Sequence, residues 1–322
     1  MFAVKRLSGI GDVLMLLPVL HILKRRTGRP VVLVTGDTIA DILRHGDGCG
    51  LDAVATEAQW RASADDLIAQ GAEFHDLDQA AFSLERRHQI DAFLAVFGLT
   101  ADEQEKGLRL PRPEYEQMLV TGYLDEVDPE PQGPRVLLHP AVSAENRTYP
   151  AEHWQTLAER LEQAGYSVFA IGSNHASAGK GCHVLDIDPD RNLIDRFSFW
   201  QTLELMRQSD VLISTDSAPI HMAGATDIAI VNIASIVPGG WRMPFRTGHP
   251  GLWSASVEPD CPYFPCYPSI LEPDCIEAVA EDMKVRGNKF LFDWCRRPDV
   301  RYDCLRRDIT PERILAALPP RP

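Results

Sequence analysis

Short apolar segments alternate with amphipathic segments of helical length along most of the chain, and this alternation constrains the fold more than any other feature. In the second half the expected strands are 135–139, 166–171, 211–215 and 228–233, and the expected helices are 151–165, 199–208 and 217–225. Strands that alternate with helices form parallel sheets through right-handed crossovers. We therefore expect an α/β fold with doubly wound sheets.

The same alternation is weaker in the first half but begins clearly. A strand is expected at 2–7, a glycine-bearing turn at 8–11, a helix at 12–26 and a second strand at 31–34. An acidic, proline-rich segment separates the halves, and 322 residues are enough for two domains. The expected divisions are a first domain at 1–125, a linker at 126–134, a second domain at 135–305 with a cysteine-rich segment at 261–304, and a C-terminal helix and tail at 306–322.

Composition and charge exclude several classes of protein. Lys and Arg number 32 against 46 Asp and Glu, so the formal net charge is −14, which disfavours non-specific nucleic-acid binding. The longest apolar run, 13–23, is shorter than a membrane-spanning helix, which needs about 20 residues, so no transmembrane segment is expected. Asp12 interrupts the apolar stretch of the N-terminal segment 1–26, and three basic residues end that segment, unlike a signal peptide. Seven cysteines are too few for a secreted disulfide scaffold, and we expect a cytoplasmic protein.

The first glycine turn places a carboxylate at the start of a helix. Ser8, Gly9 and Gly11 form a loop that lets a ligand approach the backbone closely. A dinucleotide fingerprint would need a third glycine where Leu14 stands, so an NAD-dependent oxidoreductase is disfavoured. Asp12 is either a helix-capping carboxylate or a general base, because open α/β sheets bind ligands at this edge.

Residues 214–221, Ser-Thr-Asp-Ser-Ala-Pro-Ile-His, form the strongest motif. They follow a buried strand and open a helix, so their backbone N–H groups would face a phosphate in front of that helix. The expected donor-binding residues here are Thr215, Asp216, Ser217, Ala218 and His221. The alternative is an ordinary strand–turn–helix corner that Asp216 caps.

Three further features bear on the binding of phosphate or metal. Arg147 follows the first strand of the second half and can hold a phosphate with two parallel hydrogen bonds, or it is an ordinary loop arginine. The stretch 284–313 carries nine basic against five acidic residues, so it is either a solvated surface or a patch for a phosphate-bearing partner. Two D-x-D pairs, 76–78 and 186–188, are expected by chance in a chain this acidic.

Five of the seven cysteines lie within 44 residues of the chain. Several thiolates in a proline-rich segment of an otherwise reduced protein favour a structural metal site for zinc or iron. The expected ligands are Cys261, Cys266, Cys275 and Cys304, with Cys295 as a substitute. The spacing lacks a C-x2-C pair, so the alternative is a set of unlinked buried thiols or an adventitious disulfide.

Together these motifs resemble the ADP-heptose:lipopolysaccharide heptosyltransferase family, which has the GT-B architecture. The matching stretches are 11–20, 139–154, 216–225 and, with the cysteine-bearing members, 266–267, 275 and 304–312. The resemblance implies two Rossmann-like domains that face each other across a cleft, with the acceptor on the first and the nucleotide-sugar on the second. By position, Asp12 matches the catalytic base, Arg147 a basic residue that contacts the donor, and 215–221 the donor-phosphate motif. Trp200 stands where many members have an acid near the nucleotide, and an indole can stack on a base.

The resemblance thus implies an inverting glycosyltransferase that moves a sugar, heptose first, from a nucleoside-diphosphate sugar such as ADP-heptose to a hydroxyl acceptor. One carboxylate takes the proton of the acceptor hydroxyl. A helix N-terminus, Arg147 and His221 would supply positive potential to the departing diphosphate without a divalent metal.

The sequence leaves alternatives to this interpretation. The acceptor is expected to be a glycan, with a protein side chain or a hydroxylated nucleic-acid base as alternatives, since relatives that hold iron on cysteines glycosylate proteins. A different class is a non-catalytic binding protein on the same scaffold, for which Asp12→Asn would change nothing. The sequence leaves the oligomeric state open.

Overall fold

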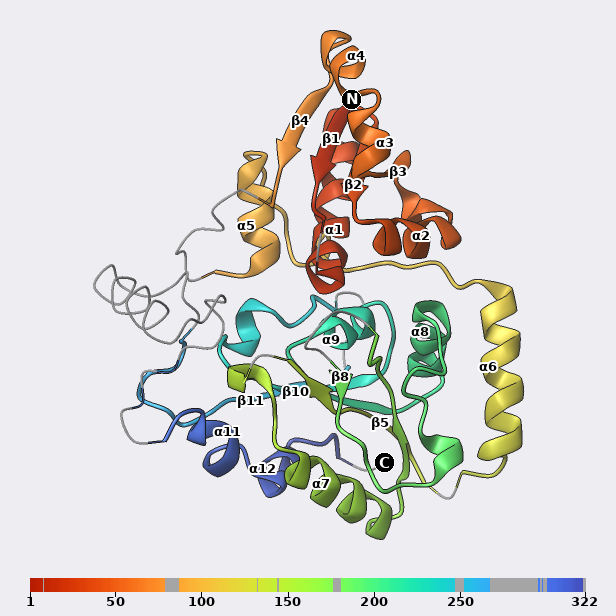
Figure 1. The fold of residues 1–322 in the computed structure, drawn as a ribbon, viewed down its shortest axis with the longest axis vertical. Helices are drawn as coiled ribbons and strands as arrows, with labels where there is room; N and C mark the ends of the chain where they lie inside the picture. The colour runs from red at the N-terminus through yellow and green to blue at the C-terminus, as the bar shows by residue number, and fades with distance from the viewer. Residues whose placement is uncertain are drawn as a thin grey trace.

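The computed structural model describes residues 1–7, 9–78, 87–131, 133–143, 145–175, 181–246, 252–266, 295, 297 and 300–320. Two parallel β-sheets lie in separate layers with helices between them (Figure 1). In these ranges no helix is both long enough and apolar enough to cross a bilayer.

The first sheet contains four parallel strands in the order β3-β2-β1-β4. They are β1 (Phe2–Lys5), β2 (Val31–Thr35), β3 (Ala53–Thr56) and β4 (Glu73–Asp76). The accompanying helices are α1 (Ile10–Thr27), α2 (Asp37–His45), the 3-10 turn η1 (Asp47–Gly50), α3 (Glu57–Arg61), α4 (Ala64–Ala69) and α5 (Gln89–Val96). Because β2 and β4 flank β1 on opposite sides, the loops after β1 and β4 diverge at a topological switch point, where open α/β sheets bind ligands.

The second sheet contains five parallel strands in the order β11-β10-β9-β5-β7. They are β5 (Arg135–His139), β7 (Ser167–Ala170), β9 (Val211–Thr215), β10 (Ala229–Ile233) and β11 (Ser254–Val257), and a separate antiparallel pair is β6 (Ala141–Val142) and β8 (Gly181–Cys182). The four strands expected here are confirmed, whereas β11 lies in a segment for which no strand was expected. The switch point of this sheet lies between β5 and β9, which pair directly.

The helices that follow α5 in the chain accompany the second sheet. They are α6 (Glu114–Val127), η2 (Glu145–Arg147), α7 (Ala151–Gln163), η3 (Pro189–Arg191), α8 (Phe199–Arg207), α9 (Ala218–Ala223), η4 (Gly239–Trp241), α11 (Asp303–Arg307) and α12 (Pro311–Ala316). Helices α8 and α9 lie toward the first sheet, whereas α7 and α12 pack together on the far face (Figure 1). One apolar cluster, with Leu16, Phe93 and Leu212 among its members, therefore continues from one sheet to the other.

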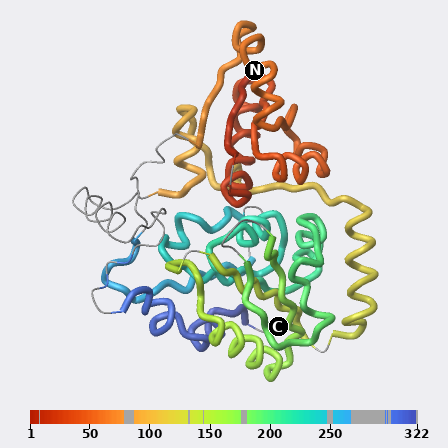
Figure 2. The backbone as a smooth tube through the Cα atoms, viewed as in Figure 1, coloured from red at the N-terminus to blue at the C-terminus, as the bar shows by residue number. Residues whose placement is uncertain are grey.

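Helix α6 leaves the first sheet and runs beside α8 of the second half (Figures 1 and 2). Arg112, just before α6, makes a two-pronged ion pair with Glu204 of α8, at 2.9 Å to Oε2 and 2.5 Å to Oε1. Thr121 of α6 and Gln208 also exchange hydrogen bonds at 3.0–3.3 Å. The end of the segment expected in the first domain thus packs against the second.

Candidate active site

The loop after β1 brings Asp12 to the first turn of α1. Gly9 has a φ of +78°, a left-handed conformation that favours glycine, and it forms the N-cap of α1, so Asp12 is not the capping residue. Arg6 donates to Asp12 Oδ2 at 2.7 Å, and Arg242 of the second domain lies 3.6 Å from Oδ1. The carboxylate therefore lies between one guanidinium from each domain. Ser8, expected in this loop, lies outside the described residues.

The D-x-D pair at 76–78 binds the end of β1, just before this loop. Both oxygens of Asp78 accept from the backbone N–H of Leu7 at 3.1 Å, and Asp76 pairs with Lys5 Nζ at 3.0 Å. Arg6 Nη1 lies 3.7 Å from Asp78 Oδ1. These contacts engage both acids and hold the strand end that carries Arg6.

The turn after β9 is tied to β5 by a triangle of hydrogen bonds. Ser217 Oγ lies 3.0 Å from Ser214 Oγ and 3.1 Å from His139 Nδ1, and the Ser214 and His139 atoms are 3.0 Å apart. Burial lowers the pKa of His139 to about 4, so its ring is neutral at pH 7. Thr215 and Asp216 are buried within the turn, and no side chain caps α9, so the capping alternative for Asp216 does not hold.

Arg147 reaches the same turn from η2. Its Nη2 donates to the backbone carbonyl of Asp216, and its guanidinium lies 3.8 Å from the Asp216 carboxylate. The Arg147 side chain keeps 31% of its surface exposed. The guanidinium is therefore both attached to the turn and accessible to a ligand.

The two switch points meet where α1 packs on α9. A Cβ added to Gly11 would lie 2.8 Å from His221 Cδ2 and 3.6 Å from the Cα of Ala218, so only glycine permits this approach. Burial lowers the pKa of His221 to about 4, an effect that the nearby Asp216 carboxylate opposes only in part. His221 is therefore neutral at pH 7. It therefore does not carry the positive charge that was expected of it.

Trp200 lies at the contact between the domains and is buried, with 3% of its surface exposed. Its Nε1 donates to the carbonyl of Ile42 at 2.8 Å, and a Cβ on Gly46 would overlap its ring. The indole therefore fills space between α2 and α8, and it has no face open to a nucleotide base.

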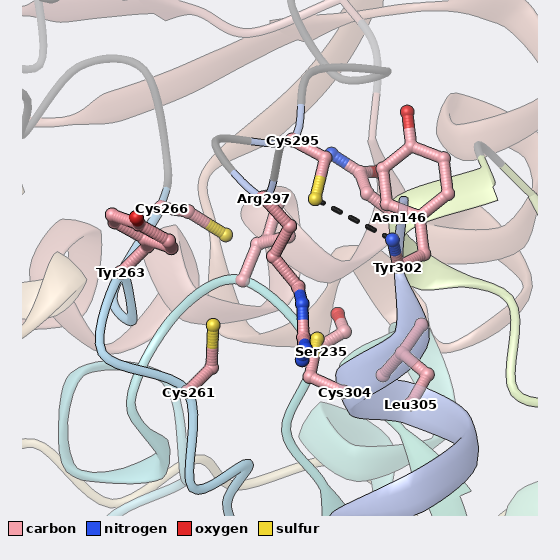
Figure 3. A pocket seen from close by; sticks show the side chains of 11 residues that line it. Asn146, Ser235, Cys261, Tyr263, Cys266, Cys295, Arg297, Tyr302, Cys304 and Leu305 are labelled. Atoms are coloured by element: carbon pink, nitrogen blue, oxygen red, sulfur yellow. Dashed lines mark hydrogen bonds between the residues drawn. The ribbon is translucent and has the colours of Figure 1, made fainter. Parts of the chain in front are cut away.

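Four of the five clustered cysteines line one small cavity, with their sulfur atoms directed into it (Figure 3). They are Cys261, Cys266, Cys295 and Cys304; Cys275 lies outside the described residues. The cavity volume of about 20 Å³ is enough for one water-sized occupant. None of these four cysteines is in a disulfide.

Two thiols of this cavity, Cys266 and Cys304, are held in the protonated form at neutral pH. Burial, with a smaller contribution from the neighbouring thiols, raises the pKa of Cys266 and of Cys304 to about 12. Within the described ranges, no group of three or more His, Cys, Asp or Glu side chains is close enough together to hold a metal ion.

Several solved structures share this fold. A family 9 glycosyltransferase from Veillonella parvula matches with a TM-score of 0.67 at 13% identity, over 98% of this chain and 95% of that one. Heptosyltransferase II of E. coli matches with a TM-score of 0.56 at 14% identity, over 89% and 99% of the two chains. The iron-containing heptosyltransferase TibC of E. coli, solved with ADP-D-β-D-heptose, matches with a TM-score of 0.60 at 14% identity, over 98% and 74%. The fold is thus GT-B, with two Rossmann-like domains.

The family follows from the sequence itself. The model for glycosyltransferase family 9 (heptosyltransferase) matches residues 64–233, slightly more than half of the chain. The chain belongs to this family, and the protein is a glycosyltransferase, which confirms the resemblance drawn from the motifs. No curated protein matches the sequence.

Three residues of the candidate site were not expected from the sequence: Arg6, Arg242 and His139. Arg6 follows a strand and precedes the glycine loop by two residues, so its position at the sheet edge was a usable signal. His139 ends a predicted strand at the same edge of the second sheet. Arg242 lies in an irregular segment after η4, where no periodicity marks a position as facing the site.

Proposed function

We propose that this glycosyltransferase transfers a sugar from a nucleoside-diphosphate sugar to a hydroxyl acceptor with inversion of configuration at the anomeric carbon. Asp12 is the general base. The observation that carries the proposal is the contact of Gly11 with His221 and Ala218, which sets the Asp12 loop against the turn at 215–221. Each of these loops lies at the switch point of its own sheet. A base on one domain thus faces a phosphate-binding turn on the other.

The reaction needs one proton acceptor and a stabilised leaving group. Asp12 takes the proton of the acceptor hydroxyl while the hydroxyl oxygen attacks the anomeric carbon on the face opposite the diphosphate. The new C–O bond forms as the bond from that carbon to the phosphate oxygen breaks, and the diphosphate leaves with the electron pair. Arg6 donates to Asp12 Oδ2 at 2.7 Å, whereas Arg242 approaches Oδ1 only to 3.6 Å, so Oδ1 is the oxygen that takes the proton.

The leaving diphosphate is stabilised by groups of the second domain. Arg147 and Arg242 supply the positive charge, and Ser217 and the neutral His221 supply hydrogen bonds. His139 orients the Ser217 hydroxyl through the bond at 3.1 Å. These side chains can serve a diphosphate without a divalent cation.

ADP-heptose is the donor that the comparisons favour, because TibC, which shares the fold, was solved with ADP-D-β-D-heptose. The acceptor is proposed to be a hydroxyl of a glycan, in the cytoplasm. A protein side chain or a hydroxylated nucleic-acid base as acceptor would be a distinct outcome of the transfer assay.

A structural zinc or iron ion on the cysteines is the second part of the proposal. Four soft thiolate donors around a cavity for one occupant fit such an ion, and a structural neighbour, TibC, is iron-containing. Cys261, Cys266, Cys295 and Cys304 would hold it, and their sulfur atoms have to draw together to do so. The ion would tie the segment after β11 to α11.

The base assignment is tested with Asp12→Asn. We expect the rate of sugar transfer from ADP-heptose to fall by about 10²–10⁴-fold, because asparagine cannot take the proton of the acceptor hydroxyl. ADP should still raise the melting temperature, since the donor groups lie on the other domain. Asp37→Asn is the matched control, because Asp37 also lies in the first turn of a helix that follows a strand of the same sheet.

Two results would contradict the proposal. One is transfer by Asp12→Asn at the wild-type rate. The other is a wild-type protein that binds none of ADP, UDP, GDP or their sugars in a thermal-shift assay, which would favour a binding protein on this scaffold.

A further inference from the structure

Two buried polar side chains in the wall of the cysteine cavity lack hydrogen-bond partners. Asn146 is 4% exposed and Ser235 is 3% exposed, and both line the cavity (Figure 3). Among the described residues, neither Nδ2 nor Oδ1 of Asn146 has a partner, and neither does Ser235 Oγ. Buried polar groups in folded proteins are nearly always paired, and two of these atoms, Asn146 Nδ2 and Ser235 Oγ, can donate, so the wall offers two donors to an occupant that accepts hydrogen bonds.

The cavity already contains one hydrogen bond of that kind. The backbone N–H of Tyr302 donates to Cys295 Sγ at 3.4 Å. A thiolate bound to a metal is a strong buried acceptor, and donors around metal-bound sulfur tune and hold the ligands. The Asn146 amide and the Ser235 hydroxyl are the two further donors that the wall offers.

Asn146 also connects the cavity to the donor side of the candidate site. It lies in η2 immediately before Arg147, whose Nη2 donates to the backbone of Asp216 in the phosphate turn. Ser235 follows β10, and the next residue, Ile236, accepts a backbone hydrogen bond from Cys266 at 3.1 Å. A displacement of the cysteines can therefore be passed to Arg147 through Asn146 alone.

We propose that Asn146 is a positioning residue that joins the two sites. Its amide N–H donates to a thiolate of the metal-bound cysteines, and this bond fixes η2 so that Arg147 stays on the phosphate turn. Ser235 supports the same thiolate cluster from β10. The inference rests on the metal ion of the proposed function but does not depend on the role of Asp12.

The test measures the metal and the nucleotide separately. Wild-type protein and Asn146→Ala are loaded with Fe(II), and with Co(II) as a spectroscopic probe, and then titrated with EDTA. We expect Asn146→Ala to bind the metal at least about tenfold more weakly and to shift the thiolate-to-cobalt charge-transfer band. The Kd for ADP should rise about fivefold in the metal-loaded variant.

Two further variants keep the test decisive. Asn146→Asp has the same shape but presents only acceptors to the thiolates, so it should lose the metal more readily than Asn146→Ala. It keeps the test decisive if Asn146→Ala folds poorly. Asn232→Ala is the matched control, because Asn232 is buried but bonds Ser256 and does not line the cavity. It should keep the wild-type metal affinity and charge-transfer band.

The outcomes separate this inference from the proposed reaction. Wild-type metal affinity and band position in Asn146→Ala and Asn146→Asp would overturn the hydrogen bond, and a weakened metal with an unchanged ADP Kd would overturn the link to Arg147. A wild-type protein that transfers sugar but takes up neither ion would overturn the inference and leave the transferase intact. Metal loss in Asn146→Ala together with full activity of Asp12→Asn would support this inference and overturn the role of Asp12 as the base.

Discussion

At the scale of single residues, the candidate site combines positions that a sequence pattern can mark with positions that it cannot. Asp12 and the turn at 215–221 lie at strand–helix corners, which apolar periodicity locates well. Their partners come from tertiary contact: Arg242 meets Asp12 only because the second domain folds over the first. The neutral state of His221 also depends on burial by elements distant in sequence, so its expected charge was wrong.

Arg242 is predicted to act on the reaction rather than on the fold. Arg242→Ala should lower kcat/KM for the donor by about 10–100-fold, because it removes one of the two positive charges proposed to stabilise the leaving diphosphate. Arg242→Lys should recover part of that loss. The measurement is steady-state transfer at varied donor concentration, with urea unfolding as a control, and a variant as active as wild type would refute the role.

At the scale of elements, the apolar strands β5, β7, β9 and β10 were predictable, whereas β11 and the connections between domains were not. Strand β9 and its partners are continuous apolar runs, which is the pattern of a strand buried on both faces. Helix α6 has few buried positions, and its packing on α8 depends on the Arg112–Glu204 ion pair. The cavity of the cysteines joins segments that are far apart in the chain, and among the described residues it includes Cys295, which the spacing had marked only as a substitute ligand.

The contact of α2 with α8 should be intolerant of a single added methyl group. Gly46→Ala is expected to lower the free energy of unfolding by about 1–3 kcal/mol, because the new Cβ overlaps the Trp200 ring. Gly122→Ala on α6 is the matched control, since no atom lies within 4 Å of its added Cβ. It should raise stability by about 0.5–1 kcal/mol, because alanine favours a helix. Urea titrations of both variants measure the difference, and equal effects would disprove the contact.

At the scale of the whole molecule, one apolar cluster joins the two sheets. Two buried histidines lie in the second sheet and its helix, His139 and His221, and burial lowers the pKa of each to about 4. In the unfolded chain a histidine titrates near 6.5. Between these values the unfolded chain binds protons that the native protein does not, so acid should favour unfolding.

The free energy of unfolding should therefore fall as the pH drops from about 6.5 toward 4. Each buried histidine contributes about 2 kcal/mol of this loss by pH 5. His221→Gln should show a smaller loss between pH 7 and pH 5 than wild type in urea titrations. His175→Gln, at an exposed histidine, should keep the wild-type loss, and a His221→Gln profile identical to wild type would rule out this source.

The indole of Trp200 fills the space that the missing side chain of Gly46 leaves, and it donates to the backbone of Ile42. This contact makes the two domains specific to each other rather than interchangeable modules. In a hybrid enzyme that takes its first domain from a relative, any side chain at the position of Gly46 would overlap the indole, so only a first domain with glycine there would fit against Trp200.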